Sequence, residues 1–148
     1  MKRRRHSSGS VLVELALVLP LAISLILGAV HFGYLFFLYN GLEKSVRDGA
    51  RYAAGRTYTT YALYTDVVKK VVVYGSLGGT TPVVNALTQS MVVVTPIPNT
   101  AGVRPQRIRV TITGYTYTGV LSGLLGTTVL TNKPSMEIPF IGLYRPPS

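Results

Sequence analysis

One uncharged, apolar segment of the sequence constrains the fold more than any other feature. From Leu15 to Leu42, 28 consecutive residues include no Asp, Glu, Lys or Arg. A helix of about 20 apolar residues crosses the hydrocarbon core of a bilayer. The segment is therefore long enough to span a membrane as a single helix, with several residues left over.

The residues that flank this segment predict its orientation. A basic cluster precedes it, made up of Lys2, Arg3, Arg4 and Arg5. Because positively charged flanks stay on the cytoplasmic side, we expect a cytoplasmic N-terminus and an extracytoplasmic C-terminal domain. Aromatic residues gather at the far end of the segment, where an interfacial belt lies in membrane helices.

A cleaved secretory signal peptide is the simplest alternative, and three observations oppose it. The apolar run is much longer than the usual 7–15 residues of a signal peptide. No small-x-small cleavage pattern closes it, and a carboxylate, Glu14, stands where a signal peptide is apolar.

Pro20 lies within the apolar run and predicts a kink in the helix, because it cannot donate a backbone hydrogen bond to the carbonyl of Ala16.

The residues around Glu14 resemble a type IV prepilin processing site. A short basic leader ends at Gly9, Ser10 follows, and Glu14 would be the fifth residue of a chain cut between Gly9 and Ser10. The apolar helix follows this glutamate, as it does in prepilins, whereas an ordinary signal peptide has its apolar region before the cut.

Two further stretches resemble TadE-like proteins of the tight-adherence (Flp, type IVc) pilus system. The stretch from Glu14 to Pro20 is similar to the opening pattern VE-A-L-x-L-P of that family. A second stretch begins at Gly33 and continues into an R-x-G-A-R-x-A pattern that comprises Arg47, Gly49, Ala50 and Arg51. The resemblance covers residues 9 to about 55 and does not distinguish the TadE type from the TadF type.

The resemblance implies a minor pseudopilin that acts in pilus assembly and that a prepilin peptidase matures between Gly9 and Ser10. It implies the peptidase, other pilins or pseudopilins, inner-membrane pilus assembly proteins and membrane lipid as partners. The location implied is the cytoplasmic (inner) membrane, and the resemblance also allows association with a pilus. The alternative is a single-pass envelope protein with an uncleaved N-terminal anchor and an extracytoplasmic binding domain.

A carboxylate in a membrane helix is costly, so Glu14 is expected to have a function. After cleavage, Ser10 would carry an ammonium group one helical turn away, and an unpaired buried charge costs several kcal/mol. Pairing of Glu14 with the Ser10 amine of a neighbouring copy would fix the axial stagger of stacked helices, as a lone polar residue does in a coiled coil. The alternative is that Glu14 merely lies at the interface and snorkels.

We expect three parts: a leader over residues 1–9, a hydrophobic helix over 10–54, and a head domain over 55–148. Gly55 is expected to end the helix. Small residues let helices approach closely, so a glycine every eight residues from Gly33 to Gly49 predicts a packing stripe, unless the spacing is coincidental.

The head is expected to combine one helix with an antiparallel sheet. Valines on one face predict a helix over Tyr64–Tyr74, although they also permit a strand. Strands are predicted over Ser90–Pro96, Arg107–Thr118 and Ser135–Phe140, the last at a sheet edge because of its prolines. Gly119–Gly126 is typical of a turn or a helical patch. The prediction is an α+β, pilin-like fold: a long transmembrane helix followed by a small sheet domain.

The composition argues against several classes of function. The net charge is +10. The basic residues are scattered, apart from the leader, the stretch from Lys44 to Arg56, and Arg104, Arg107 and Arg109, and they form no nucleic-acid-binding module. There is no cysteine, hence no disulfide and no thiolate metal site. No catalytic set or metal-ligand cluster is recognisable, so we predict no enzyme activity and no cofactor.

Several polar residues of uncertain role remain. His31 is expected inside a helix bundle or near the membrane interface. The arginines Arg104, Arg107 and Arg109 are expected on a solvated face rather than at an anion site. Five tyrosines fit either a contact face or half-buried positions, namely Tyr58, Tyr61, Tyr64, Tyr115 and Tyr117.

Overall fold

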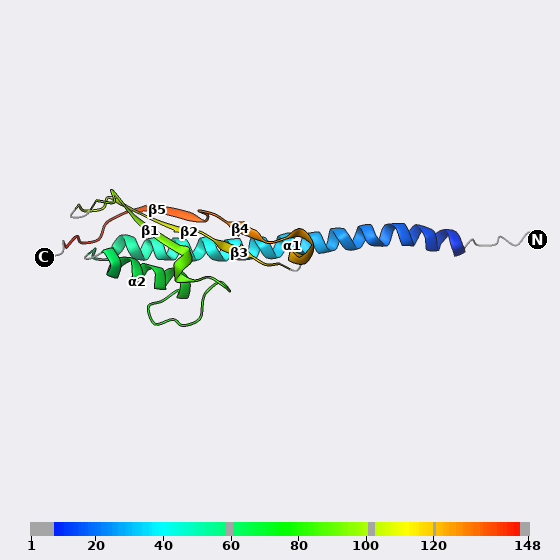
Figure 1. The fold of residues 1–148 in the computed structure, drawn as a ribbon, viewed down its shortest axis with the longest axis horizontal. Helices are drawn as coiled ribbons and strands as arrows, with labels where there is room; N and C mark the ends of the chain where they lie inside the picture. The colour runs from blue at the N-terminus through cyan, green and yellow to red at the C-terminus, as the bar shows by residue number, and fades with distance from the viewer. Residues whose placement is uncertain (1–7, 59–60, 101–102, 120, 146–148) are drawn as a thin grey trace, which may run out of the picture.

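The structure, a computed structural model, describes residues 8–58, 61–100, 103–119 and 121–145. A single long helix, α1 (Ser8–Gly55), forms the axis of the molecule (Figure 1). Its N-terminal half projects as a free rod, and its C-terminal half lies inside a small head. The 48 residues of α1 correspond to about 72 Å of helix. The helix includes Pro20 and ends at Gly55, one residue beyond the predicted end at 54. The kink expected at Pro20 stays a prediction.

The head contains a second helix, α2 (Tyr61–Tyr74), which lies along α1. The remaining elements follow in chain order: η1 (Gln89–Met91), β1 (Val92–Ile97), β2 (Arg107–Ile112), β3 (Tyr115–Tyr117), α3 (Ser122–Leu125), β4 (Thr128–Leu130) and β5 (Ser135–Pro139). A long N-terminal helix, a second helix and small antiparallel sheets confirm the predicted α+β fold.

The larger sheet has the strand order β1-β2-β5, with both pairs antiparallel. Along β2, Ile108 and Val110 are buried against the helices, whereas Arg109 between them faces outward. Two prolines of the sheet, Pro96 and Pro139, lie in the edge strands β1 and β5, where the missing N–H is tolerated. The sheet covers α1 and α2 as one layer over the other (Figure 1).

The prediction of one continuous strand over Arg107–Thr118 is wrong. Gly114 adopts a φ of +73°, which a β-strand does not allow, and the chain turns there. The buried positions change parity at this turn: Ile112 is the last of one series and Tyr115 the first of the next. The residues after Gly114 form β3, which pairs with β4 in a separate two-stranded sheet.

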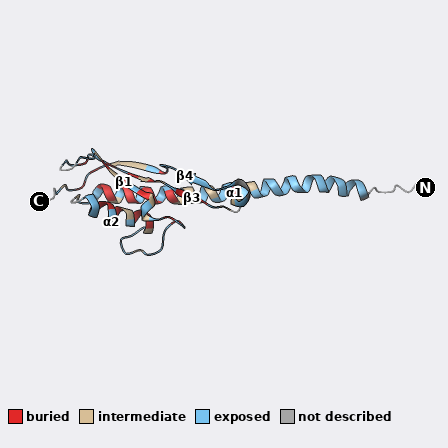
Figure 2. Cartoon of the chain, viewed as in Figure 1, coloured by how far each residue is buried: buried red, intermediate tan, exposed pale blue. Residues whose placement is uncertain are grey.

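The hydrophobic core joins both helices to the larger sheet. The C-terminal half of α1 contributes side chains spaced three or four residues apart: Leu42, Val46, Ala50 and Ala53. Val68 and Val72 of α2 and Val110 of β2 meet them. The second half of α1 therefore belongs to the core of the head, as Figure 2 shows by its colour. Burying one such valine or leucine stabilises the fold by about 1.5–3 kcal/mol.

Two of the three glycines with eight-residue spacing contact the protein's own head. A Cβ atom at Gly49 would overlap Cγ2 of Val72 in α2, and one at Gly41 would lie 3.1 Å from Cγ2 of Val84. A Cβ atom at Gly33 meets nothing within 4 Å in the described structure. The spacing therefore allows close packing within this chain at Gly41 and Gly49.

The C-terminal end of α1 is held by the last residues of the chain. The Ala54 carbonyl accepts hydrogen bonds from the backbone N–H groups of Ile141 (3.0 Å) and Gly142 (2.9 Å). The Tyr64 hydroxyl donates to the Ala53 carbonyl (2.5 Å), and burial, followed by the nearby Tyr58, raises the pKa of Tyr64 above its usual range. These bonds satisfy carbonyls that a helix end leaves without partners.

We predict that Gly49→Ala destabilises the head by about 1–3 kcal/mol, because the new methyl group forces α1 and α2 apart. The measurement is urea unfolding in detergent, followed by the near-ultraviolet circular dichroism of the tyrosines. Gly33→Ala is the matched control. It adds the same group where there is space, so its midpoint should stay or rise, because alanine favours helix more than glycine. Equal midpoints for the two variants would contradict the packing described.

Candidate functional site on the N-terminal helix

The residues predicted for processing lie in the first turns of α1. Gly9, Ser10 and Glu14 are helical and exposed. Residues four apart are neighbours on a helix surface, so the side chains of Ser10 and Glu14 share one face. A Cβ atom added at Gly9 would meet no described atom within 4 Å. The packing of this fold therefore does not require glycine at position 9. Glycine there even costs the helix about 1 kcal/mol relative to alanine.

The apolar stretch that follows Glu14 is exposed on every side of the helix (Figure 2). Leu17, for example, is 74% exposed, and Ile26 on the opposite face is 63% exposed. A helix that is apolar all round is stable only when protein or lipid covers it. The described part of this chain leaves the helix uncovered as far as Val30. By length and composition, α1 could also cross a membrane.

The free stretch has the length that a bilayer requires. From Ser10 to Val30 the helix rises about 32 Å, against about 30 Å for the hydrocarbon core. The basic residues expected to orient it, Lys2, Arg3, Arg4 and Arg5, lie outside the described residues. Pro20 lies in the middle of the free stretch.

The head begins to cover α1 at His31, which is only 7% exposed. The Tyr117 hydroxyl, from β3, donates to the His31 carbonyl at 3.2 Å and lies 3.5 Å from His31 Nδ1. The two rings meet edge to face, with centroids 5.2 Å apart. His31 is therefore held between α1 and β3, and Tyr117 is a contact residue that the sequence did not single out for this position.

The motif residues in the second half of α1 fall into two groups. Gly49 and Ala50 are buried against the rest of the head, and Gly49 faces Val72. Arg47 and Arg51 are exposed, and Arg47 forms an ion pair with Glu43 one turn earlier, with 2.8 Å between Nη2 and Oε1. The small residues thus permit the packing of α1 on α2, while the arginines face outward.

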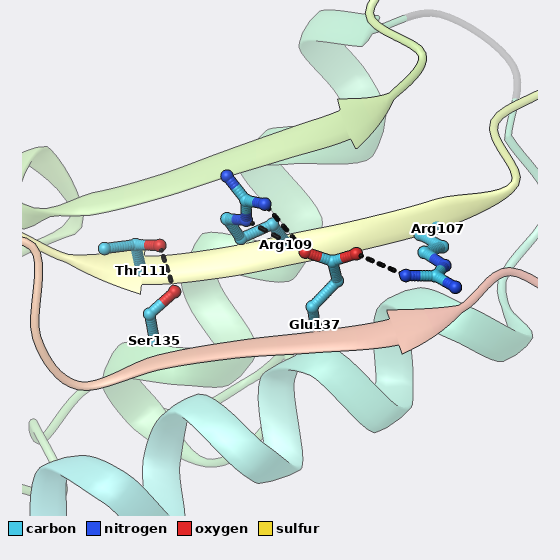
Figure 3. A network of polar contacts seen from close by, with 5 residues as sticks. All are labelled: Arg107, Arg109, Thr111, Ser135 and Glu137. Atoms are coloured by element: carbon cyan, nitrogen blue, oxygen red, sulfur yellow. Dashed lines mark hydrogen bonds and ion pairs between the residues drawn. The ribbon is translucent and has the colours of Figure 1, made fainter.

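The outer face of the larger sheet carries a small charged cluster (Figure 3). Arg109 and Arg107 donate to opposite carboxylate oxygens of Glu137, at 2.8 Å and 3.2 Å for the closest atoms. Thr111 and Ser135 hydrogen bond beside them at 2.8 Å. The predicted solvated face is confirmed for Arg107 and Arg109, because both are exposed and paired with a carboxylate.

The tyrosines are divided between the core and the surface. Tyr64, Tyr115 and Tyr117 are buried, whereas Tyr61 is 48% exposed. Tyr58 is half-buried and packs against Tyr64, with ring centroids 4.9 Å apart. Most of the set is therefore structural rather than a contact face. Within the described residues, no three His, Asp or Glu side chains gather as metal ligands.

These features define a class of protein: one with an exposed apolar N-terminal helix that could span a membrane, continued into a small α+β head. Residues 9–51 match the family model described as TadE-like protein. The chain therefore carries a TadE-like N-terminal segment, which confirms the predicted resemblance over nearly the whole range expected. Searches of curated proteins and of solved structures gave no match.

The family match has consequences for function at a coarse level. It indicates a membrane protein related to the tight-adherence pilus and associated with pilus components. TadE-like proteins are structural components of the pilus and are not known as enzymes. The match ends at Arg51 and so covers α1 but not the sheets of the head.

The Glu137 cluster predicts a pH dependence of stability. Hydrogen bonds from Arg109 and Arg107 lower the pKa of Glu137 from its ordinary 4.5. Because this pKa is lower in the folded chain than in the unfolded one, the stabilisation is complete above pH 4.5 and is lost as the pH falls through the folded pKa. Glu137→Gln should therefore lower the urea midpoint at pH 7, and the difference from the native protein should vanish in acid.

Ser135→Ala is the control, because it removes a hydrogen bond from the same strand without removing a titrating group. Its difference from the native protein should not change with pH. A Glu137→Gln difference that is the same at pH 7 and in acid would contradict the assigned role of the two arginines.

Proposed function

We propose that this protein is a TadE-like minor pseudopilin that acts in the assembly of a Flp (type IVc) pilus and is matured by a prepilin peptidase between Gly9 and Ser10. One observation carries the proposal. The Gly9, Ser10 and Glu14 pattern stands at the start of an exposed apolar helix that continues into a folded head, within a segment that matches the TadE-like family.

The identity of residue 9 supports a processing role. Glycine at this position has no structural neighbour among the described residues and costs helix stability. A peptidase that must approach the backbone closely gives a reason for the missing side chain, because glycine is the residue that permits such an approach. The cut would remove the basic leader and leave Ser10 with a free ammonium group.

The position of Glu14 supports an assembly role. One turn separates it from Ser10, so the new ammonium and the carboxylate can neutralise each other at the edge of the bilayer. When helices stack side by side away from water, an unpaired charge costs several kcal/mol. A shift of one subunit along its neighbour separates the charges, so the pair selects one axial stagger.

The same reading gives a location and a set of partners. The leader residues Lys2 to Arg5 keep the N-terminus cytoplasmic by the positive-inside rule, and the head lies on the extracytoplasmic side of the inner membrane. Prepilin peptidase, other pilins or pseudopilins, inner-membrane pilus assembly proteins and lipid are the partners. The rigid connection of α1 to the head core means that any axial movement of the helix carries the head with it.

The test is the N-terminus of the mature protein. We expect the native chain, expressed with a prepilin peptidase of a tight-adherence system, to begin at Ser10 in intact-mass and N-terminal peptide spectra. Gly9→Val should retain residues 1–9, because the side chain blocks approach to the bond. Gly28→Val is the matched control, since it also alters a helical glycine that has no described neighbour within 4 Å, and it should mature normally.

A native chain that keeps its leader, in cells where the same peptidase cleaves a known pilin, would contradict the proposal. It would favour instead a single-pass envelope protein with an uncleaved anchor. Normal cleavage of Gly9→Val would show that Gly9 is not the processing residue.

A further inference from the structure

We propose that three short elements, β3 (residues 115–117), α3 (122–125) and β4 (128–130), form a second membrane contact that lies on the bilayer surface beside α1. We call these three elements the hairpin arm. Nothing in the inference depends on processing at Gly9; it requires only that α1 spans a bilayer.

The depth of the arm in the bilayer follows from its contact with α1. The arm joins α1 at His31, through the Tyr117 hydroxyl, and Figure 1 shows it reaching further toward the N-terminus of α1 than the rest of the head. The helix from Ser10 to Val30 fills about 32 Å. Since the hydrocarbon core is about 30 Å thick and the headgroup regions bring the bilayer to about 40–45 Å, His31 and the arm fall in the headgroup layer.

The arm has no charged side chain. No Asp, Glu, Lys or Arg occurs between Val110 and Asn132, which includes the whole arm. On α1, the uncharged segment ends at Leu42, so the charges of the helix beyond Glu14 begin at Glu43. The part of the head nearest the membrane is thus uncharged, while the cluster around Glu137 lies on the larger sheet. Charged groups avoid the region where lipid replaces water.

The exposed face of the arm combines apolar and hydroxyl groups. Thr116 and Val129 are cross-strand partners that both face outward, and Val129 is 53% exposed. The valine offers apolar surface and the threonine a hydroxyl group. The headgroup layer, where apolar and polar groups of the lipid meet, accommodates both. On the inner face, Tyr117 covers His31, so the arm shields from lipid the first buried polar residue of α1.

These arguments select lipid as the occupant rather than a second copy of the chain. The depth of the arm is set by α1 within one molecule, so every copy anchored in a membrane brings its arm to the headgroup layer before it meets a neighbour. Contact with the bilayer surface is therefore a property of the single subunit.

The experiment uses the absence of tryptophan from the chain. Val129→Trp, in the full chain reconstituted in phosphatidylcholine vesicles, places the sole tryptophan on the arm. We expect its emission to shift to shorter wavelength and to be lost when the lipid carries bromine, with shallow bromines more effective than deep ones. Thr116→Trp should behave alike, and it repeats the test if Val129→Trp disturbs the hairpin.

Two exposed apolar positions serve as controls. Leu17 lies inside the proposed span and is 74% exposed, so Leu17→Trp should be quenched most by deep bromines. Ile141 is also exposed, at 78%, but its backbone N–H donates to the Ala54 carbonyl, about 35 Å along the helix from His31. Ile141→Trp should therefore not be quenched.

Each possible result decides the question. Quenching of Leu17→Trp without quenching of Val129→Trp and Thr116→Trp would overturn the inference while leaving α1 in the membrane. A blue-shifted but unquenched Val129→Trp would also overturn it, because the arm would then be covered by protein. Loss of quenching at Leu17→Trp would remove the membrane span itself and the inference with it.

Discussion

The structure depends on the packing of the second half of α1 into the core of the head. Leu42, Val46 and Ala50 lie on one face of the helix and meet α2 and the larger sheet. The same helix, without interruption, exposes apolar side chains on all faces before His31. A single rod therefore has two kinds of surface: the head covers one half, and the described chain leaves the apolar other half uncovered. The head cannot rotate or slide on the rod without opening its own core.

The polar groups follow the same division. The free half carries one carboxylate, Glu14, at its start, and the first buried polar residue, His31, marks the point where the head begins to cover the helix. Charges beyond that point lie on exposed surfaces, as in the pair of Arg47 and Glu43. A helix whose free half lies in lipid would have this order, because charge is costly there.

Sequence patterns predict the parts of this fold that depend on local periodicity. The length of α1, the helical valines of α2 and the alternation along β2 are of this kind. The end of β2 was missed because the left-handed turn at Gly114 restarts the alternation in the opposite parity. The contact of Tyr117 with His31 joins residues 86 apart in the chain, and no local pattern encodes such a pairing. The point where the head begins to cover α1 was also hidden, because leucine and valine suit protein and lipid neighbours equally.

The most direct test of the two environments is a spin-label scan along α1, which the cysteine-free sequence makes straightforward. Single cysteines from Val11 to Ala54, labelled in the full chain in vesicles, report accessibility to oxygen, which enters lipid, and to a polar nickel reagent, which does not. The account predicts high oxygen accessibility on every face up to Val30, and beyond His31 a 3.6-residue period with minima at Leu42, Val46, Ala50 and Ala53. A 3.6-residue period of protection that extends through Val11 to Val30, or lipid exposure that continues past Leu42 on all faces, would contradict it.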